Sequence, residues 1–242
     1  MTGRYDDDLS QLQEINLLQE SDSAKHLVAY GIRTLRTTAF IETTRDPIMT
    51  MLSIGFEKML KLALGLLYVE ANRVWLPAAV LKNEYRHDLV KMESLLRAEI
   101  HSNIGRATHA PYVTQALSLI DDDPVWPALV SALNRYGKEG RFYYLDALAE
   151  NPQPEDSPAS FWDAAEQIAL DHDAELTDLR RRMLDDFSLS DEFYRSLNGG
   201  LASSLQNFWD LVTMAGIQGV LGARGEVWGH DFKNVGRQID GD

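Results

Sequence analysis

One stretch of the chain, from Asp46 to Leu67, constrains the fold more than any other. Asp46 and Pro47 favour the first turn of a helix, because Asp caps free amides and Pro has no amide hydrogen to leave unpaired. The residues after them are apolar around most of the helical circumference: Ile48, Met51, Leu52, Ile54, Phe56, Met59, Leu60, Leu62, Leu64, Leu66 and Leu67. Neighbours must cover such a helix on several sides, so the stretch predicts the central helix of a helical domain.

A polar stripe interrupts this apolar surface. Thr50, Ser53, Glu57 and Lys61 follow one another at helical spacings, so their side chains share one face. Glu57 and Lys61 also have the spacing of a favourable ion pair within a helix. These charges lie in the middle of the helix, where each would be costly to bury in lipid, and we therefore expect no membrane span.

Helical spacing of apolar residues recurs along the rest of the chain, and no segment alternates apolar and polar residues over the length of a strand. We expect an all-α fold, an antiparallel helical bundle with additional helices, in one domain over residues 1–242. The Pro-rich polar segment 151–157 is predicted to be a linker. A long helix over 158–183 should follow it, capped by Ser157 and carrying a half-buried His172 on its apolar stripe.

A last long helix is expected from about Leu201 to Leu221. Gly216 and Gly219 in this helix would allow the backbone of a neighbouring element to approach closely, because neither carries a side chain. Beyond it, the segment from Gly222 to Phe232 should form a C-terminal turn.

Composition limits the chemistry that the chain can carry. The formal net charge of −14 argues against binding nucleic acid over a broad surface. The absence of cysteine excludes disulfides, thiolate catalysis and cysteine zinc sites. A carboxylate-bridged metal site needs paired Glu-x-x-His motifs, but Glu84 and His87 supply one, so we expect no metal and no other cofactor. Residues 1–8 are too polar for a signal peptide, which predicts a cytoplasmic protein.

The segment from Arg135 to Tyr144 is the most basic and aromatic part of the chain. Arg135, Lys138 and Arg141 are interleaved there with tyrosine and phenylalanine. Base stacking together with cationic side chains would suit contact with RNA or another phosphate ligand. The alternative is a loop whose aromatic side chains pack on the bundle.

Two motifs resemble the HEPN superfamily of helical domains. The first is Gly55-Phe-Glu57-Lys58 in the central helix, and the second is His87-Asp88-Leu89 at the start of a later helix. The resemblance extends over residues 22–96 and implies a HEPN-like core over 22–105, followed by C-terminal helices over 158–236. It also implies a homodimer. Many members of the family are metal-independent endoribonucleases of toxin–antitoxin or defence systems, and others are non-catalytic.

The nuclease signature of that family is an Arg followed a few residues later by a His. Arg224 and His230, with five residues between them, match it. The resemblance implies that His230 is the general acid and base at the ribose 2′-OH, while Arg224 holds the phosphate and its developing charge. This hypothesis makes RNA the substrate and gives the chain an antitoxin or a nucleotidyltransferase as its partner.

The second hypothesis is a non-catalytic binding or dimerisation module. Glu57, Lys61, His87 and Asp88 would then form a polar junction between helices, or a dimer face. The two hypotheses differ in geometry, because catalysis requires Arg224 and His230 on one accessible wall of a cleft. Both hypotheses place His87 close to Glu57.

Overall fold

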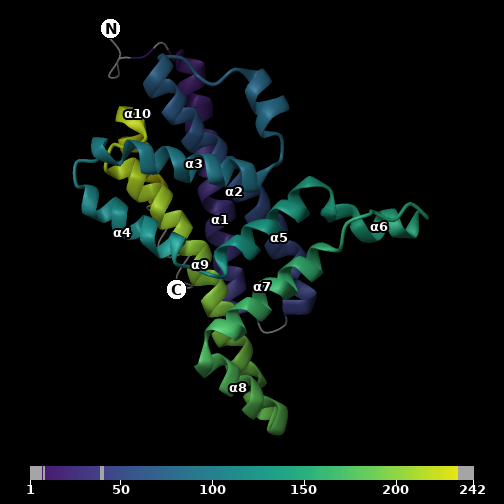
Figure 1. Ribbon diagram of the computed structural model, residues 1–242. Helices are drawn as coiled ribbons and strands as arrows, with labels where there is room; N and C mark the ends of the chain where they lie inside the picture. The colour runs from purple at the N-terminus through teal and green to yellow at the C-terminus, as the bar shows by residue number, and fades with distance from the viewer. Residues whose placement is uncertain (1–6, 8, 39–40, 234–242) are drawn as a thin grey trace.

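The computed structural model describes residues 7, 9–38 and 41–233, and every regular element within them is helical (Figure 1). The expected all-α class is therefore confirmed. The longer helices are α1 (Gln11–Thr37), α2 (Ile41–Asn72), α3 (Leu89–Asn103), α4 (Ala110–Asp121), α5 (Trp126–Lys138), α6 (Tyr143–Leu148), α7 (Pro158–His172), α8 (Ala174–Asp185), α9 (Ser190–Ile217) and α10 (Gly222–Lys233). A π-helix, η1, spans Val80–Tyr85, and 3₁₀ turns span Ile104–Arg106, Gly140–Phe142 and Phe187–Leu189. Positions 234–236 of the expected C-terminal helices lie outside the described residues.

Two helices form the centre of the bundle. Helix α2 packs against α1, α3, α5 and α10, and helix α9 packs against α1, α4, α7, α8 and α10. Phe56 of α2, Trp126 of α5 and Phe208 of α9 meet in the core, with the Trp126 and Phe208 rings stacked at 4.4 Å between centroids. The prediction that the apolar stretch after Pro47 forms the central helix is confirmed.

Helix α2 begins earlier than the Asp46–Pro47 pair predicts. It starts at Ile41, and Pro47 lies inside it. Ile41 is fully buried, and the Arg45 guanidinium forms an ion pair with Asp163 of α7 at 2.8 Å. These contacts hold the first turns in helical form, so the expected start at Asp46 is wrong.

The helix expected over 158–183 is two helices. Ser157 caps α7 by accepting a hydrogen bond from the Ser160 amide, as predicted. The chain then breaks at Asp173, whose carboxylate accepts from the Leu176 amide and caps α8. His172 is the last residue of α7 and is exposed, with Nδ1 2.9 Å from the Ile168 carbonyl oxygen. The prediction of a half-buried His172 is therefore wrong.

The last helices meet at glycine. The close approach predicted at Gly216 is confirmed, because a Cβ atom there would lie 2.8 Å from the Gly225 carbonyl oxygen of α10. Gly219 instead lies in the turn after α9, where its φ of +81° favours glycine. The expected C-terminal turn is a helix, α10, whose Trp228 and Phe232 are buried against the bundle.

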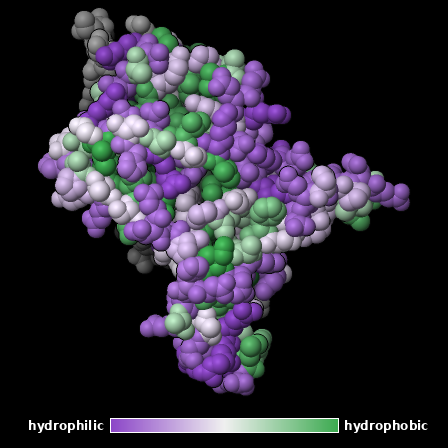
Figure 2. Space-filling view, in the orientation of Figure 1, coloured by the Kyte–Doolittle hydropathy of each residue, from purple (hydrophilic) through white to green (hydrophobic). Residues whose placement is uncertain are grey.

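Helices α6 and α8 project from the body of the molecule in different directions (Figure 1). Polar residues cover most of the face seen in Figure 2, with apolar residues near the end of the α8 projection. Leu184, in the last turn of α8, and Phe187, shortly after that helix, are 75% and 78% exposed. Within the described part of the chain, no helix combines the length and the apolar character needed to span a bilayer.

Candidate functional site

The polar stripe of α2 meets the segment that precedes α3. Lys61 Nζ donates to Glu57 Oε1 at 2.6 Å, and His87 Nδ1 lies 3.0 Å from Glu57 Oε2. The predicted proximity of Glu57, Lys61 and His87 is thus confirmed. The Glu57 side chain is 16% exposed and the His87 side chain 54% exposed, so the carboxylate anchors an imidazole that reaches solvent. A tautomer that donates from Nδ1 leaves Nε2 as a free hydrogen-bond acceptor.

Asp88 extends this junction to α5. Its carboxylate caps α3 by accepting from the Lys91 amide at 3.1 Å, and it forms an ion pair with Lys138 at 2.8 Å. Burial alone raises the pKa of Asp88, but the hydrogen bonds from Lys138 and the Lys91 amide outweigh it, so the pKa lies below its ordinary value. Asp88 is therefore an ionised link between α3 and α5 at neutral pH.

The backbone before His87 is unusual. The six residues of η1 form a π-helix, and Arg86 follows with φ of 48° and ψ of −117°. π-Helical turns and non-glycine residues in sparsely populated backbone regions are often found at functional sites. The Arg86 amide donates to the Leu81 carbonyl, while its guanidinium makes no ion pair or hydrogen bond with the described residues.

A cleft of about 430 Å³ lies beside this junction. Its lining residues are Glu84, Tyr85, Arg86, His87, Asp88, Lys91, Arg135, Lys138, Glu139 and Glu155. Four of them are Lys or Arg and four are Asp or Glu, so the formal charges of the wall cancel. The cleft therefore suits a ligand that carries both signs of charge better than it suits a polyanion.

The three predicted phosphate-contacting residues have different roles. Arg135 is buried, and its guanidinium donates to the Asp156 carbonyl at 2.8 Å and to Gln153 Oε1 at 2.6 Å. It thereby fastens the expected linker 151–157 to α5. Lys138 is paired with Asp88, whereas Arg141 is exposed beside the Phe142 ring, 5.1 Å from its centroid.

The aromatic residues near Arg141 do not pack into the bundle as the structural alternative predicts. Phe142 and Tyr144 are 49% and 65% exposed. Gly137, Lys138 and the residues after Tyr143 are helical, and α6 carries the aromatic side chains away from the core. The part of the segment after Glu139 is therefore a projection, whereas Arg135 and Tyr136 are buried on α5, as the structural alternative predicts for its aromatic residues.

The predicted catalytic pair lies on α10. The Arg224 guanidinium donates to Asp7 Oδ1 at 2.9 Å and to Glu14 Oε1 at 2.8 Å, and its side chain is 11% exposed. The hydrogen bond from Arg224 holds the pKa of Asp7 below its ordinary value. Arg224 is therefore engaged in fastening the chain near the start of α1 to α10.

His230 is exposed on the same helix, six positions after Arg224. At 1.5 Å and about 100° per residue, the two residues are separated by roughly 9 Å along the axis and about 120° around it. The structure thus does not bring the two side chains together on one wall of the cleft described above.

Two further features, the buried carboxylate of Glu93 and the backbone conformation of Arg86, were not predicted from the sequence. The buried Glu93 carboxylate accepts from Trp126 Nε1 at 2.9 Å and pairs with Arg97 at 2.7 Å. Its spacing from Leu89, Met92, Leu96 and Ile100 places it on the buried face of α3, so the pattern did contain a signal. By contrast, no pattern in the sequence indicates the positive φ of Arg86. Within the described residues, no group of three or more His, Asp or Glu side chains is placed to hold a metal ion.

Comparison with protein-family models, curated proteins and solved structures finds no match for this chain.

Proposed function

We propose that this chain is a non-catalytic, HEPN-like binding module that recognises a polypeptide segment of mixed charge in the cleft beside His87. The observation that carries the proposal is the junction of Glu57, Lys61 and His87, in which a largely buried carboxylate orients an exposed imidazole at the cleft. A fixed polar side chain loses less conformational entropy on binding than a free one.

The charges of the cleft favour a peptide over RNA. Its wall holds equal numbers of acidic and basic side chains, and the chain as a whole has a formal charge of −14. An RNA backbone gains affinity by neutralising many phosphates, which a wall of this composition cannot do. A peptide carries both signs, so it can pair with Arg86 and with Glu84 or Glu139. The carboxylates of Glu84 and Glu139 lie in the same wall and form no hydrogen bond or ion pair with the described residues.

The ribonuclease hypothesis requires Arg224 to face a scissile phosphate. Arg224 is instead held by two carboxylates, Asp7 and Glu14, and any phosphate would have to displace them. The geometry therefore favours the binding hypothesis over an endoribonuclease of a toxin–antitoxin or defence system.

Selection from a random-peptide phage library on the immobilised full-length protein tests the proposal. We expect enriched peptides that carry both signs of charge, and we expect their affinity, measured by fluorescence anisotropy, to fall at least fivefold for Arg86→Ala and His87→Ala. His172→Ala is the matched control, because His172 is also exposed but lies on α7 away from the cleft lining. Peptides that bind the two cleft variants as tightly as the wild type would contradict the proposal.

A further inference from the structure

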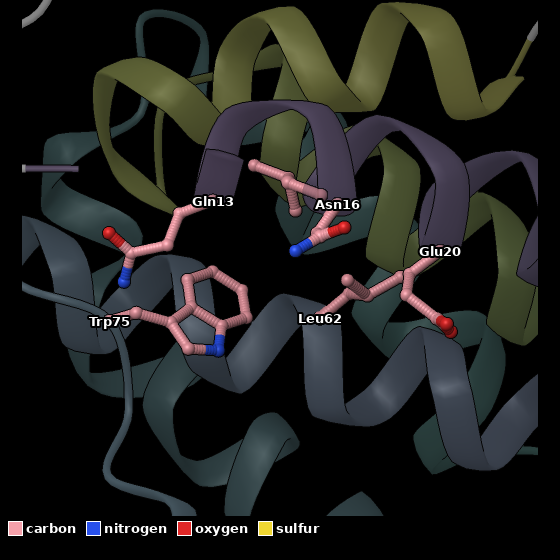
Figure 3. Close-up of a pocket in the computed structure, with 6 residues that line it drawn as sticks. Gln13, Asn16, Glu20, Leu62 and Trp75 are labelled. Carbon is pink, nitrogen blue, oxygen red and sulfur yellow. The ribbon is translucent and has the colours of Figure 1, made fainter. Parts of the chain in front are cut away.

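A second hollow lies between α1 and α2 and is separate from the cleft. It measures about 210 Å³ and is lined by Gln13, Asn16, Leu17, Glu20, Leu62 and Trp75. Figure 3 shows the Trp75 indole facing Gln13 and Asn16 of α1, with Leu62 of α2 beyond it. Pockets for drug-sized ligands commonly measure about 300–1,000 Å³, so this pocket suits one planar ring system rather than a larger molecule.

Gly65 determines the position of the indole. A Cβ atom on Gly65 would lie 2.5 Å from Cη2 and 2.6 Å from Cζ2 of Trp75, which is closer than such atoms approach in proteins. The edge of the ring therefore occupies the space that a side chain on α2 would need. This contact fixes one wall of the pocket as a flat aromatic surface, beside the aliphatic side chains of Leu17 and Leu62.

The polar atoms around the pocket are mainly unused donors. Gln13 Oε1 already accepts from the Ser10 amide at 2.9 Å, within the cap of α1, so the Gln13 amino group is the part that remains for a ligand. In Figure 3 that nitrogen lies on the side of Trp75. Neither the Asn16 amide nor the Trp75 indole N–H has a hydrogen-bond partner among the described residues.

The acceptors at the rim are fewer. They are Asn16 Oδ1 and the Glu20 carboxylate, which is paired with Lys58 at 2.8 Å. The lining contains no Lys or Arg, and Lys58 beside the rim is already paired with Glu20, so a phosphate group would find no unpaired cation there. The complementary ligand is neutral and planar, with several acceptors and an amino group at the edge of its ring.

We propose that this pocket binds a neutral heteroaromatic ring of the nucleobase type, stacked or edge-packed on Trp75 and hydrogen-bonded by Gln13 and Asn16. The site is independent of the proposed function of the cleft, because the two share no lining residue. Such a ring is available as a free base or nucleoside, or as an unpaired base within RNA. The absence of cations in the lining favours the uncharged forms.

Titration of the full-length protein with adenine, adenosine, adenosine 5′-monophosphate and a short oligoadenylate tests the assignment. Two-dimensional NMR of the indole N–H signals reports binding, and Trp75→Phe identifies the Trp75 signal. We expect adenine and adenosine to shift that signal with a Kd of about 0.1–1 mM, as befits a ligand of few atoms. The monophosphate and the oligonucleotide should bind no more tightly than adenosine.

Three variants connect binding to the pocket. Trp75→Leu and Gly65→Ala should each weaken adenosine at least tenfold, the second by displacing the indole, and Asn16→Ala should weaken it severalfold. Isothermal titration calorimetry measures the binding of adenosine to all three variants, and thermal melting verifies that each variant is folded. Gln19→Ala is the matched control, since Gln19 is an exposed amide of the same helix outside the pocket lining, and it should bind as the wild type does.

The assignment is overturned if none of the four compounds shifts the Trp75 signal at 10 mM, or if Trp75→Leu and Asn16→Ala bind adenosine unchanged. A monophosphate or oligonucleotide that binds tenfold more tightly than adenosine would replace a neutral ligand with a phosphate-bearing one. A result of either kind leaves the peptide-binding test of the cleft unaffected.

Discussion

Arg224 belongs to a motif that suggests catalysis, but in the structure it forms ion pairs within the chain. Its guanidinium donates to Asp7 and Glu14 and is largely buried, whereas His230 is exposed. We predict that Arg224→Ala lowers the free energy of unfolding by about 1–3 kcal/mol, because it removes the hydrogen-bonded cation of Asp7, whose side chain is 4% exposed. Urea denaturation followed by circular dichroism measures the change.

His230→Ala is the comparison for that experiment. Because the His230 side chain is exposed, its removal should change the free energy of unfolding by less than about 0.5 kcal/mol. Equal losses for the two variants, or a larger loss for His230→Ala, would show that the ion pairs of Arg224 do not stabilise the fold.

Asp210 gives a prediction with a definite pH dependence. Burial raises the pKa of this carboxyl, and Lys233 only partly offsets the effect. The folded state therefore holds the proton more strongly than the unfolded chain does. Stability is lost as pH rises from the unfolded value, near 3.9, through the raised folded pKa. Asp210→Asn should remove that loss, so the variant should melt at a higher temperature than the wild type at pH 7.

Melting temperatures measured from pH 4 to pH 8 test this sign. The difference between Asp210→Asn and the wild type should shrink as pH falls, and the same substitution at an exposed position, Asp185→Asn, is the surface comparison. A difference that grows on acidification would contradict the assigned direction.

Some residues of the candidate site could be predicted and others could not. Glu57 and Lys61 follow from helical spacing, and the HEPN-like pattern connects them with His87. The strained backbone of Arg86 depends on how η1 and α3 join, which no local pattern records. Burial of the Arg135 guanidinium depends on the later segment that holds Gln153 and Asp156. A residue that belongs to a basic patch in the sequence therefore makes its hydrogen bonds inside the fold instead of facing a ligand.

At the scale of helices, type was predictable and boundaries were not. The chain from Ser21 to Ser23 has the residues of a helix cap, yet α1 runs through it without a break. Ser21 is buried there, and its hydroxyl accepts from Trp228 Nε1 at 3.0 Å. Ile41 and Arg45 likewise extend α2 through long-range contacts. Local propensity is a weak determinant wherever a distant element supplies the partner.

The contact of α9 with α10 provides a test at the same scale. A Cβ atom on Gly229 would lie 2.6 Å from the Ile217 amide nitrogen and 2.8 Å from the Thr213 carbonyl oxygen, both of which are backbone atoms. Gly229→Ala must therefore separate the two helices, and we expect it to cost about 1–3 kcal/mol of unfolding free energy. Urea denaturation gives the value.

Gly200→Ala is the matched control within α9. A Cβ atom there meets nothing within 4 Å, so the gain in helix propensity should stabilise the protein by about 0.5–1 kcal/mol. Destabilisation by Gly200→Ala of the size expected for Gly229→Ala would refute the explanation from close approach.

At the scale of the whole molecule, the features that bear on the proposed binding role are the net charge and the two projecting helices. The chain has a formal charge of −14. Helices α6 and α8 project from the body of the molecule, and apolar side chains remain exposed on both projections. The cleft beside His87 is a part of this acidic molecule in which opposite charges balance. The fold class followed from sequence periodicity, but these projections arise from chain reversals that periodicity does not encode.

Incubation of the purified full-length protein with end-labelled single-stranded RNA in EDTA is the most direct test of whether the chain binds or cuts. We predict that the RNA stays intact with the wild type and with His230→Ala, because Arg224 is held by Asp7 and Glu14 and lies about 120° around the helix from His230. Fragments with 2′,3′-cyclic phosphate ends that appear with the wild type and vanish with His230→Ala would contradict the binding-module account and establish the nuclease.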